Sequence, residues 1–347
     1  MRIQLSDHFT YKKLLRFTLP TVLMLVCTSM YSVVDGFFVS NFVGKTSFAA
    51  VNLIFPVSMG VAALGFMLGT GGSAVVAKTI GEGKKELANQ YFSMVIYVGI
   101  ALSMIFSVIC VLFMPRIARM LGAEGTLLQD CIIYGRVLFV AETAFILQNM
   151  FQSFFVAAEK PGLSLKINIA AGLTNVVFDY VFIAAFRWGV AGAALATGMG
   201  QVVGGIVPLI YFARKNDSLL RLTGKVRLYG KVLAKTCGNG SSEMVTNLSS
   251  SLVNILYNFQ LMRLAGEDGV AAFGVIMYVN FIFIAVFMGY SVGSAPVVSY
   301  HYGAGNHGEL KNLYKKSLFL LTLGSIILTV AAEIFAEPLV KIFVNYD

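Results

Sequence analysis

Long apolar runs alternate with short polar stretches along the whole chain. A helix needs roughly 20 apolar residues to cross a bilayer, and nine runs meet that length. They cover residues 17–41, 48–77, 91–114, 137–158, 167–186, 188–212, 237–262, 270–299 and 317–336. The runs are continuously apolar and lack the period-2 alternation of strands in a membrane barrel, so the pattern predicts transmembrane helices.

Two of these spans resemble each other in sequence. When residues 44–83 are aligned with 266–305, eleven of the 40 positions are identical, including glycines at both ends of the stretch. Because six spans separate the copies, both run in the same direction, as in parallel repeats related by an axis along the membrane normal. We therefore predict an all-α polytopic membrane protein with two lobes, a helical bundle with a parallel internal repeat.

The repeat divides the chain into three parts. Residues 1–212 form an N-terminal lobe of six helices, residues 213–236 a basic linker, and residues 237–347 a C-terminal lobe of three helices. A symmetric partner for the first lobe would need three more helices, so we expect the second lobe to be incomplete in this sequence.

Composition supports the membrane assignment: 57% of the residues are hydrophobic, only 12% are charged, and the mean hydropathy is +0.78. About 25% charged residues are usual in a soluble domain. The chain carries 26 Lys and Arg against 17 Asp and Glu, but these basic residues lie between the apolar runs, so we expect no nucleic-acid partner. Placing the N-terminus in the cytoplasm puts nineteen of the 26 on the inside, which predicts that orientation in a cell (plasma or inner) membrane.

The sequence holds no motif for soluble chemistry. The four cysteines have no CxxC spacing, the three histidines have no metal-ligand spacing, and no GxxxxGK[ST] sequence occurs. We therefore expect neither an enzyme nor a cofactor beyond a coupling ion. Three small-residue spacings, Gly65-xxx-Gly69, Gly200-xxx-Gly204 and Gly289-xxx-Gly293, predict close approach of helices.

Four acidic residues lie well inside predicted spans, and such residues are functional candidates because an unpaired charge in a bilayer is costly. They are Asp35, Glu142, Asp179 and Glu243. At 1.5 Å per residue the first three lie about 8–10 Å from the outer ends of their spans, so they share one level. Asp35 and Asp179 could instead be structural hydrogen-bonding groups, Glu142 could pair with Arg136, and Glu243 could be hydrated near the cytoplasmic surface.

Polar side chains recur at helical spacing on the spans that carry these acids, so each helix is predicted to turn one polar side inward. The stripes are Thr28, Ser32 and Asp35; Asn168, Asn175 and Asp179; Glu142, Asn149 and Ser153; and Glu243, Asn247, Ser250, Asn254 and Asn258. Candidate residues of a substrate cavity are Glu142, Asn149, Gln152, Glu243, Asn247 and Asn254.

Three segments resemble the multidrug and toxic compound extrusion (MATE) family. Residues 31–39 (YSVVDGFFV) resemble the first-helix pattern of the family, residues 175–183 (NVVFDYVFI) its fifth-helix N-x-x-x-D motif, and residues 188–197 (WGVAGAALAT) the start of its sixth helix. The resemblance implies twelve helices in two six-helix lobes that rock between inward-open and outward-open states. Helices ten to twelve have no counterpart in this sequence.

The resemblance also implies a function and a site. Members of the family export organic cations and drugs in exchange for Na⁺ or H⁺. The cation-coupling residues carried over would be Asp35, Asn175, Asp179 and Thr197, with Na⁺ as the metal ion. Two carboxylates at one depth cannot both stay charged cheaply, and a shared Na⁺ or a proton would relieve the repulsion.

Two other functions remain open from the sequence. The wider superfamily includes lipid-linked oligosaccharide flippases, for which we expect a more cationic cavity than the acidic residues here provide. A non-transporting channel or scaffold would show no saturable counter-transport. The partners we expect are membrane lipid and a small cationic or lipophilic substrate, with the protein as a monomer.

Overall fold

The computed structural model describes residues 3–224 and 226–343, and every regular element in this part of the chain is helical. The α-helices are α1 (Tyr11–Phe38), α2 (Lys45–Gly81), α3 (Lys85–Met120), α4 (Gly125–Ala157), α5 (Pro161–Asp179), α6 (Gly189–Ala213), α7 (Gly230–Gly303) and α8 (His307–Phe343). Short π-helical segments, Val39–Val43 and Tyr180–Ala185, follow α1 and α5. The predicted all-α membrane fold is confirmed.

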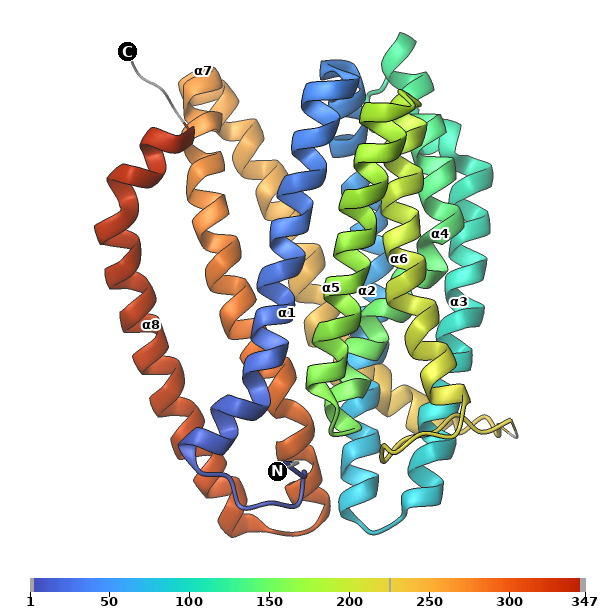
Figure 1. Cartoon of the computed structure of the whole chain (residues 1–347), viewed down its shortest axis with the longest axis vertical. Helices are drawn as coiled ribbons and strands as arrows, with labels where there is room; N and C mark the ends of the chain where they lie inside the picture. Colours follow the sequence, from blue (N-terminus) through green and yellow to red (C-terminus); the bar gives the residue numbers. More distant parts are fainter. Residues whose placement is uncertain (1–2, 225, 344–347) are drawn as a thin grey trace.

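The helices run along one long axis, with α2 to α6 on one side, α8 and the later part of α7 on the other, and α1 between them (Figure 1). The first part of α7 starts beside α2 to α6 and crosses behind the bundle to the other side (Figure 1). We refer to α1–α6 as the first half and to α7 and α8 as the second half. Residues 3–10 lie at one end of this bundle, together with the turns 82–84, 158–160 and 304–306 and the connection between α6 and α7. We call this end the basic end, because most of the lysines and arginines of the chain lie there.

Seven segments of the described chain are long and apolar enough to cross a membrane. They are Tyr11–Tyr31, Thr46–Gly81, Lys85–Met120, Pro161–Ala185, Gly189–Ala213, Phe283–Gly303 and His307–Ile334. Seven of the nine predicted spans correspond to them. The other two, in α4 and in the first part of α7, carry polar stripes, yet both run along the bundle beside the apolar helices (Figure 1).

Helix α7 contains two predicted spans and doubles back at the end of the bundle opposite the basic end (Figure 1). Its first arm runs antiparallel to α2, with Gly240 against Met67 and Gly60 facing Leu248. Its second arm runs antiparallel to α1, because Gly289 lies against Val22 and Gly293 against Thr18. The residues between the two predicted spans are helical as well.

The internal repeat is visible in the contacts between α2 and the second arm of α7. A Cβ added at Gly81 would contact the carbonyl oxygen of Tyr300, and one added at Gly303 would contact that of Lys78. Lys78 and Tyr300 are matched positions of the repeat, as are Gly81 and Gly303, so the contact is reciprocal, as at a two-fold axis. Two residues after each of these glycines, Gly83 and Gly305 have the positive φ angles (79° and 68°) that close a helix.

The three glycine spacings pack as predicted. Gly65 and Gly69 bring α2 against the backbone of α4 at Ile146 and Met150. Gly200 and Gly204 bring α6 against Asn175 of α5 and Gln148 of α4. Gly289 and Gly293 form the contact of α7 with α1 described above. Small residues at these positions let helix backbones approach closely, which is a main source of association between helices in a bilayer.

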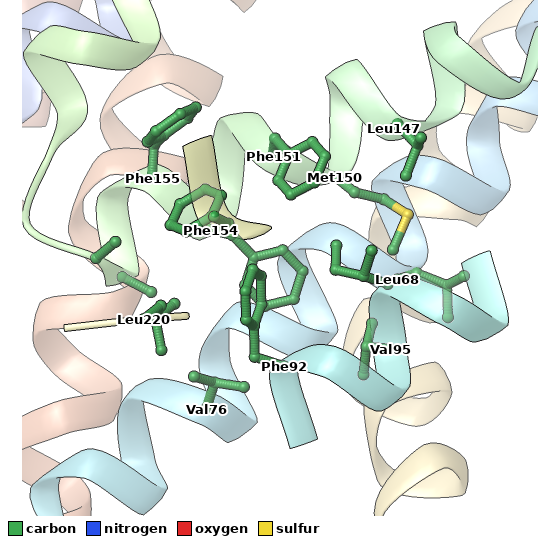
Figure 2. Packing of buried hydrophobic residues seen from close by; sticks show 14 of the residues in the cluster. Leu68, Val76, Phe92, Val95, Leu147, Met150, Phe151, Phe154, Phe155 and Leu220 are labelled. Atoms are coloured by element: carbon green, nitrogen blue, oxygen red, sulfur yellow. The ribbon is translucent and has the colours of Figure 1, made fainter. Parts of the chain in front are cut away.

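A buried apolar cluster holds the first half together near the basic end (Figure 2). The ring of Phe92 on α3 packs edge-on against Phe154 of α4 and Phe212 of α6, with centroids 4.8 and 5.1 Å apart. Leu220, from the connection 214–229, is fully buried in the same cluster. The backbone N–H of Arg221 also donates to Asn89 of α3, so this connection packs on the first half. The predicted linker 213–236 extends beyond this connection, because α7 begins at Gly230.

Residues 3–10, which precede α1, connect the two halves at the basic end. The backbone N–H of Leu5 donates to Glu159 in the α4–α5 turn (2.7 Å), and the N–H of Phe9 donates to Glu309 of α8 (2.9 Å). The carbonyl oxygen of Phe9 accepts hydrogen bonds from Asn312 and Lys316 of α8 (3.1 and 2.6 Å). The short N-terminal segment therefore has an anchor on each half.

Candidate functional site

The four residues predicted to couple a cation come from three helices that converge away from the basic end. Asp35 lies in the last turn of α1, Asn175 and Asp179 lie one turn apart on α5, and Thr197 lies on α6. Positions i and i+4 share one face of a helix, so Asn175 and Asp179 point the same way. The structure therefore brings the two predicted α5 residues onto one side of that helix.

Two glycines explain why these helices meet so closely. A Cβ at Gly172 of α5 would fall inside the space of the Tyr31 ring, one turn before Asp35 on α1. A Cβ at Gly200 of α6 would lie 3.0 Å from the Cβ of Asn175 and 2.9 Å from the carbonyl oxygen of Ala171. Larger residues at either position would push α1 or α6 away from α5 and separate the polar groups.

Thr197 connects α6 to Asp35 of α1. Its Oγ1 lies 3.5 Å from Oδ1 of Asp35 and 3.1 Å from the backbone carbonyl oxygen of Ala193. A hydroxyl has one proton to donate, and the shorter distance favours the carbonyl as its acceptor. When Thr197 donates to Ala193, the lone pairs of its oxygen are free for a cation or for a protonated Asp35.

Asp179 is the most unusual side chain of the group. It is fully buried, and neither of its carboxylate oxygens has a hydrogen-bond partner. Asp35 is its acidic neighbour, and the Nδ2 atom of Asn175 is also buried without a partner. A buried carboxylate that makes no hydrogen bond is costly, so this arrangement calls for a proton or a bound cation.

Tyr134 of α4 completes the cluster, and sequence reasoning missed it. The side chain is 2% exposed, lies beside Thr197 and is close enough to Asp35, Asp179 and Glu142 to interact with them electrostatically. Tyr134 lies three residues before the predicted span 137–158, so, as one tyrosine among 15, it falls outside the polar stripe predicted for that span. Its hydroxyl adds a group beside the acids that can donate or accept a hydrogen bond.

Both acid-bearing helices change geometry beside the site. The π-helical segments follow directly on Asp179 in α5 and within one turn of Asp35 in α1. The wider i→i+5 bonds are those from the N–H of Phe186 to Val181 (2.9 Å) and from the N–H of Gly44 to Val39 (3.2 Å). Such segments recur at functional sites, where they redirect side chains.

Glu142 lies on α4 where this helix packs against α2. Its Oε2 accepts a hydrogen bond from Ser58 (2.9 Å), whereas Oε1 is buried and unpartnered. Arg136 is exposed, and the structure shows no ion pair between these two described residues. The alternative in which Arg136 neutralises Glu142 is therefore wrong.

The other α4 candidates for a substrate cavity face different neighbours. Asn149 donates to the carbonyl oxygen of Phe145 on its own helix (3.0 Å) and lies where Gly65 of α2 approaches. Gln152 faces α5 and α6 and lines a cavity of about 10 Å³ with Asn168. That volume suits one water molecule and not a drug.

The second-half candidates lie on the first arm of α7. Glu243 and Asn247 are half-buried, and the side-chain amide of Asn247 donates to the carbonyl oxygen of Glu243 (2.8 Å). The side chain of Asn254 lies outside the described residues. The structure thus joins Asp35, Asn175, Asp179 and Thr197 in one cluster and leaves the predicted substrate residues spread over several faces.

The donor set of the cluster is made of oxygens. The described residues hold no group of three or more His, Cys, Asp or Glu that could bind a metal ion. Two carboxylates, an amide oxygen and a hydroxyl are hard, oxygen-only donors. They suit an alkali cation or a proton better than a transition metal.

The comparisons with known proteins agree with this architecture. The chain is 23% identical to the multidrug export protein MepA of Staphylococcus saprophyticus over 335 residues, and 23% identical to MepA of Staphylococcus aureus strain N315 over 333 residues. The alignments cover 96% of this chain and 74% and 73% of those proteins.

Solved structures share the fold. A multidrug resistance MATE family transporter of the MOP superfamily in its outward-facing conformation superposes with a TM-score of 0.91 at 24% identity, over 97% of this chain and 75% of that one. A MOP superfamily transporter from Pyrococcus furiosus, whose binding pocket is described as having reverse polarity, gives 0.89 at 24% identity, over 98% and 75%. The profile of the MatE family matches residues 20–181 and 243–347, which is most of the chain, and the protein therefore belongs to the MatE family of membrane transporters.

Proposed function

We propose that the protein is a secondary active transporter that exports organic cations and other lipophilic drugs in exchange for Na⁺ or H⁺. Its membership of the MatE family and its similarity to the multidrug export protein MepA support drug efflux. The observation that carries the ion coupling is Asp179, a fully buried carboxylate with both oxygens unpartnered beside a second acid. A mobile cation or proton would supply the missing partner.

The coupling follows from a difference in affinity between two arrangements of the protein. A cation that binds the Asp35–Asp179 cluster more tightly in one arrangement shifts the protein toward it. A drug that binds better to the other arrangement then opposes the cation, and this reciprocal effect is sufficient for exchange. The reciprocal contact of α2 with α7 at the basic end is a candidate for the gate that opens and closes.

The chemistry of the substrate follows from the charges. The charged candidates inside the spans of the first half, Asp35, Glu142 and Asp179, are all acidic, and aromatic side chains are abundant, with 28 Phe and 15 Tyr in the chain. Acidic and aromatic groups attract lipophilic cations through charge and through cation–π contact. The same acidity is opposite to what an exporter of anionic lipid-linked sugars needs, which weighs against the flippase alternative.

The test is dye efflux from proteoliposomes under an imposed Na⁺ or H⁺ gradient. The Asp35→Asn, Asp179→Asn double variant keeps the shape of both side chains and removes their charge, so we expect gradient-driven efflux to be lost. Glu86→Gln, at an exposed position in the first turn of α3, is the matched control and keeps full efflux. Full gradient-driven efflux in the double variant would contradict the proposal, and the ion that drives the unmodified protein identifies the coupling ion.

We also propose that the basic end faces the cytoplasm, since short loops rich in Lys and Arg stay on that side of the membrane. In a cysteine-free background, a cysteine at Asp217, in the connection 214–229, should be protected in intact cells from an impermeant thiol reagent. A cysteine at Arg187, in the turn between α5 and α6, should react. The opposite pattern would reverse the orientation.

A further inference from the structure

A pocket of about 510 Å³ opens at the basic end between α2, α3 and both arms of α7. Lys78 and Lys84 line it from α2 and the α2–α3 turn, and Lys235 and Tyr302 line it from the two arms of α7. It lies far along the bundle from the Asp35–Asp179 cluster and shares no residue with it. We call it the basic pocket.

The charge of the basic pocket is positive. Among its lining residues Glu82 is the only acid, and it contacts Lys84 (3.0 Å) and Lys78 (3.6 Å). The hydrogen bond from Lys84 lowers the pKa of the Glu82 carboxyl, so Glu82 is ionised at neutral pH. Lys235 makes no ion pair with any described residue. Three cations against one anion leave an uncompensated positive charge that attracts an anion.

The lining also suits a phosphate group attached to an apolar body. Hydroxyl and amide donors are present in Ser299 and Asn239, and lysine ammonium groups bind phosphate as point charges. Apolar side chains, including Val75 and Val298, continue the lining toward the membrane-spanning parts of α2 and α7. Basic pockets between transmembrane helices on the cytoplasmic side are typical sites for anionic lipid headgroups.

Both halves of the protein build the basic pocket. The ammonium of Lys78 lies over the ring of Tyr302, 5.4 Å from its centroid, directly beside the reciprocal contact of Gly81 and Gly303. If α2 and the second arm of α7 separated at the basic end, the walls of the pocket would separate with them. A ligand held by both walls therefore favours the arrangement in which this end is closed.

We propose that the basic pocket binds the phosphate group of an anionic ligand, the headgroup of a phospholipid or a soluble phosphate, and that the bound ligand holds the two halves together at the basic end. The inference does not depend on which substrate is exported or on which ion drives export. Its test needs no transport measurement.

The full-length chain is purified and placed in nanodiscs of phosphatidylcholine with or without phosphatidylglycerol. Retained phosphatidylglycerol is counted by native mass spectrometry. A basic residue near the membrane surface contributes roughly fivefold to the binding of an anionic lipid. We therefore expect Lys235→Gln to weaken retention about fivefold and Lys235→Arg to preserve it. Glu82→Gln removes the acid that pairs with Lys78 and Lys84, so it should strengthen the retention of phosphatidylglycerol.

Lys311→Gln, an exposed lysine of α8 at the same end but outside the basic pocket, is the matched control and should bind as the unmodified protein does. In a separate experiment, inorganic phosphate is added to the protein in nanodiscs without phosphatidylglycerol. An increase in Tm with phosphate assigns the site to a soluble anion. An increase in Tm with phosphatidylglycerol alone assigns the site to the lipid. Equal retention in Lys235→Gln and Lys311→Gln, or no preference for either probe over phosphatidylcholine, overturns the proposal.

The conformational part is tested by the distance between spin labels at residues 86 and 311, on α3 and α8, in a cysteine-free background. Adding whichever probe binds, phosphatidylglycerol or inorganic phosphate, should narrow the distribution of distances between the two spin labels toward shorter values. Lys235→Gln should remove this effect. An unchanged distribution in the presence of a probe that demonstrably binds contradicts the closing role.

Discussion

Acidic side chains occur in two contrasting settings in this protein. Asp179 and Glu142, in the membrane-spanning part of the first half, are fully buried, and three of their four carboxylate oxygens have no partner. At the basic end, Glu309 is almost as deeply buried but accepts hydrogen bonds from the N–H of Phe9 and from Asn312, and it contacts His8 at 2.6 Å. The carboxylate is the same chemical group in both settings, but it has hydrogen-bond partners at Glu309 and lacks them at Asp179.

The difference separates structural acids from exchangeable ones. Where the protein supplies fixed hydrogen-bond donors, as at Glu309, the carboxylate stabilises a contact between elements. Where it supplies none, as at Asp179, the cation or proton of the proposed exchange would be the missing partner. A transporter needs such an acid, because a permanent counter-ion would compete with the coupling cation. Three variants test this comparison.

The largest expected contrast between activity and stability is at Asp179. Asp179→Asn should abolish gradient-driven efflux and leave the apparent Tm unchanged or higher, because the substitution removes an unpaired buried charge. Dye efflux and thermal unfolding of the same preparation measure the two effects. A fall in Tm of several degrees would show that Asp179 has fixed partners and is structural, which would break the comparison.

The opposite result is expected at Glu309. Glu309→Gln loses charge-assisted hydrogen bonds that anchor residues 3–10 to α8, at a cost of about 2 kcal/mol. The apparent Tm should fall by roughly 2–4 °C per kcal/mol, whereas efflux per folded molecule should change little. Thermal unfolding measures the first effect and dye efflux the second. An unchanged Tm together with lost coupling would place Glu309 among the exchangeable acids.

The smallest effect is expected at Asp217, which is exposed and bonded to Lys160 of the α4–α5 turn at 2.5 Å. This hydrogen bond lowers the pKa of the Asp217 carboxyl below its ordinary value of 3.8. A carboxyl whose pKa is lowered by folding stabilises the folded state at pH values above its ordinary pKa. This stabilisation is lost as the pH falls through the lowered pKa.

Asp217→Asn should therefore change neither efflux nor Tm between about pH 5 and 8 by more than the small amount typical of surface ion pairs. The matched measurement is the pH dependence of Tm for both proteins. A large loss in the variant at neutral pH would show that the contact of the connection 214–229 with the α4–α5 turn matters more than its exposure suggests.

Much of the fold and part of the site were predictable from the sequence. The apolar runs dictate helices because backbone polar groups in a bilayer must be satisfied within the helix. Matched glycines at 81, 83, 303 and 305 indicated the repeat, since close backbone approach and a positive φ favour glycine at these positions. The spacing of Asn175 and Asp179 placed both on one face of α5, because helical periodicity is local.

Other features required the tertiary structure. The reversal of α7, the position of Tyr134 among the acids and the gathering of Lys78, Lys84 and Lys235 around one pocket join residues far apart in the chain. No local pattern encodes them, because each depends on which helices pack together and at what rotation. The sequence determined which groups are costly to bury, whereas only the packing of helices decided which of them would find a partner.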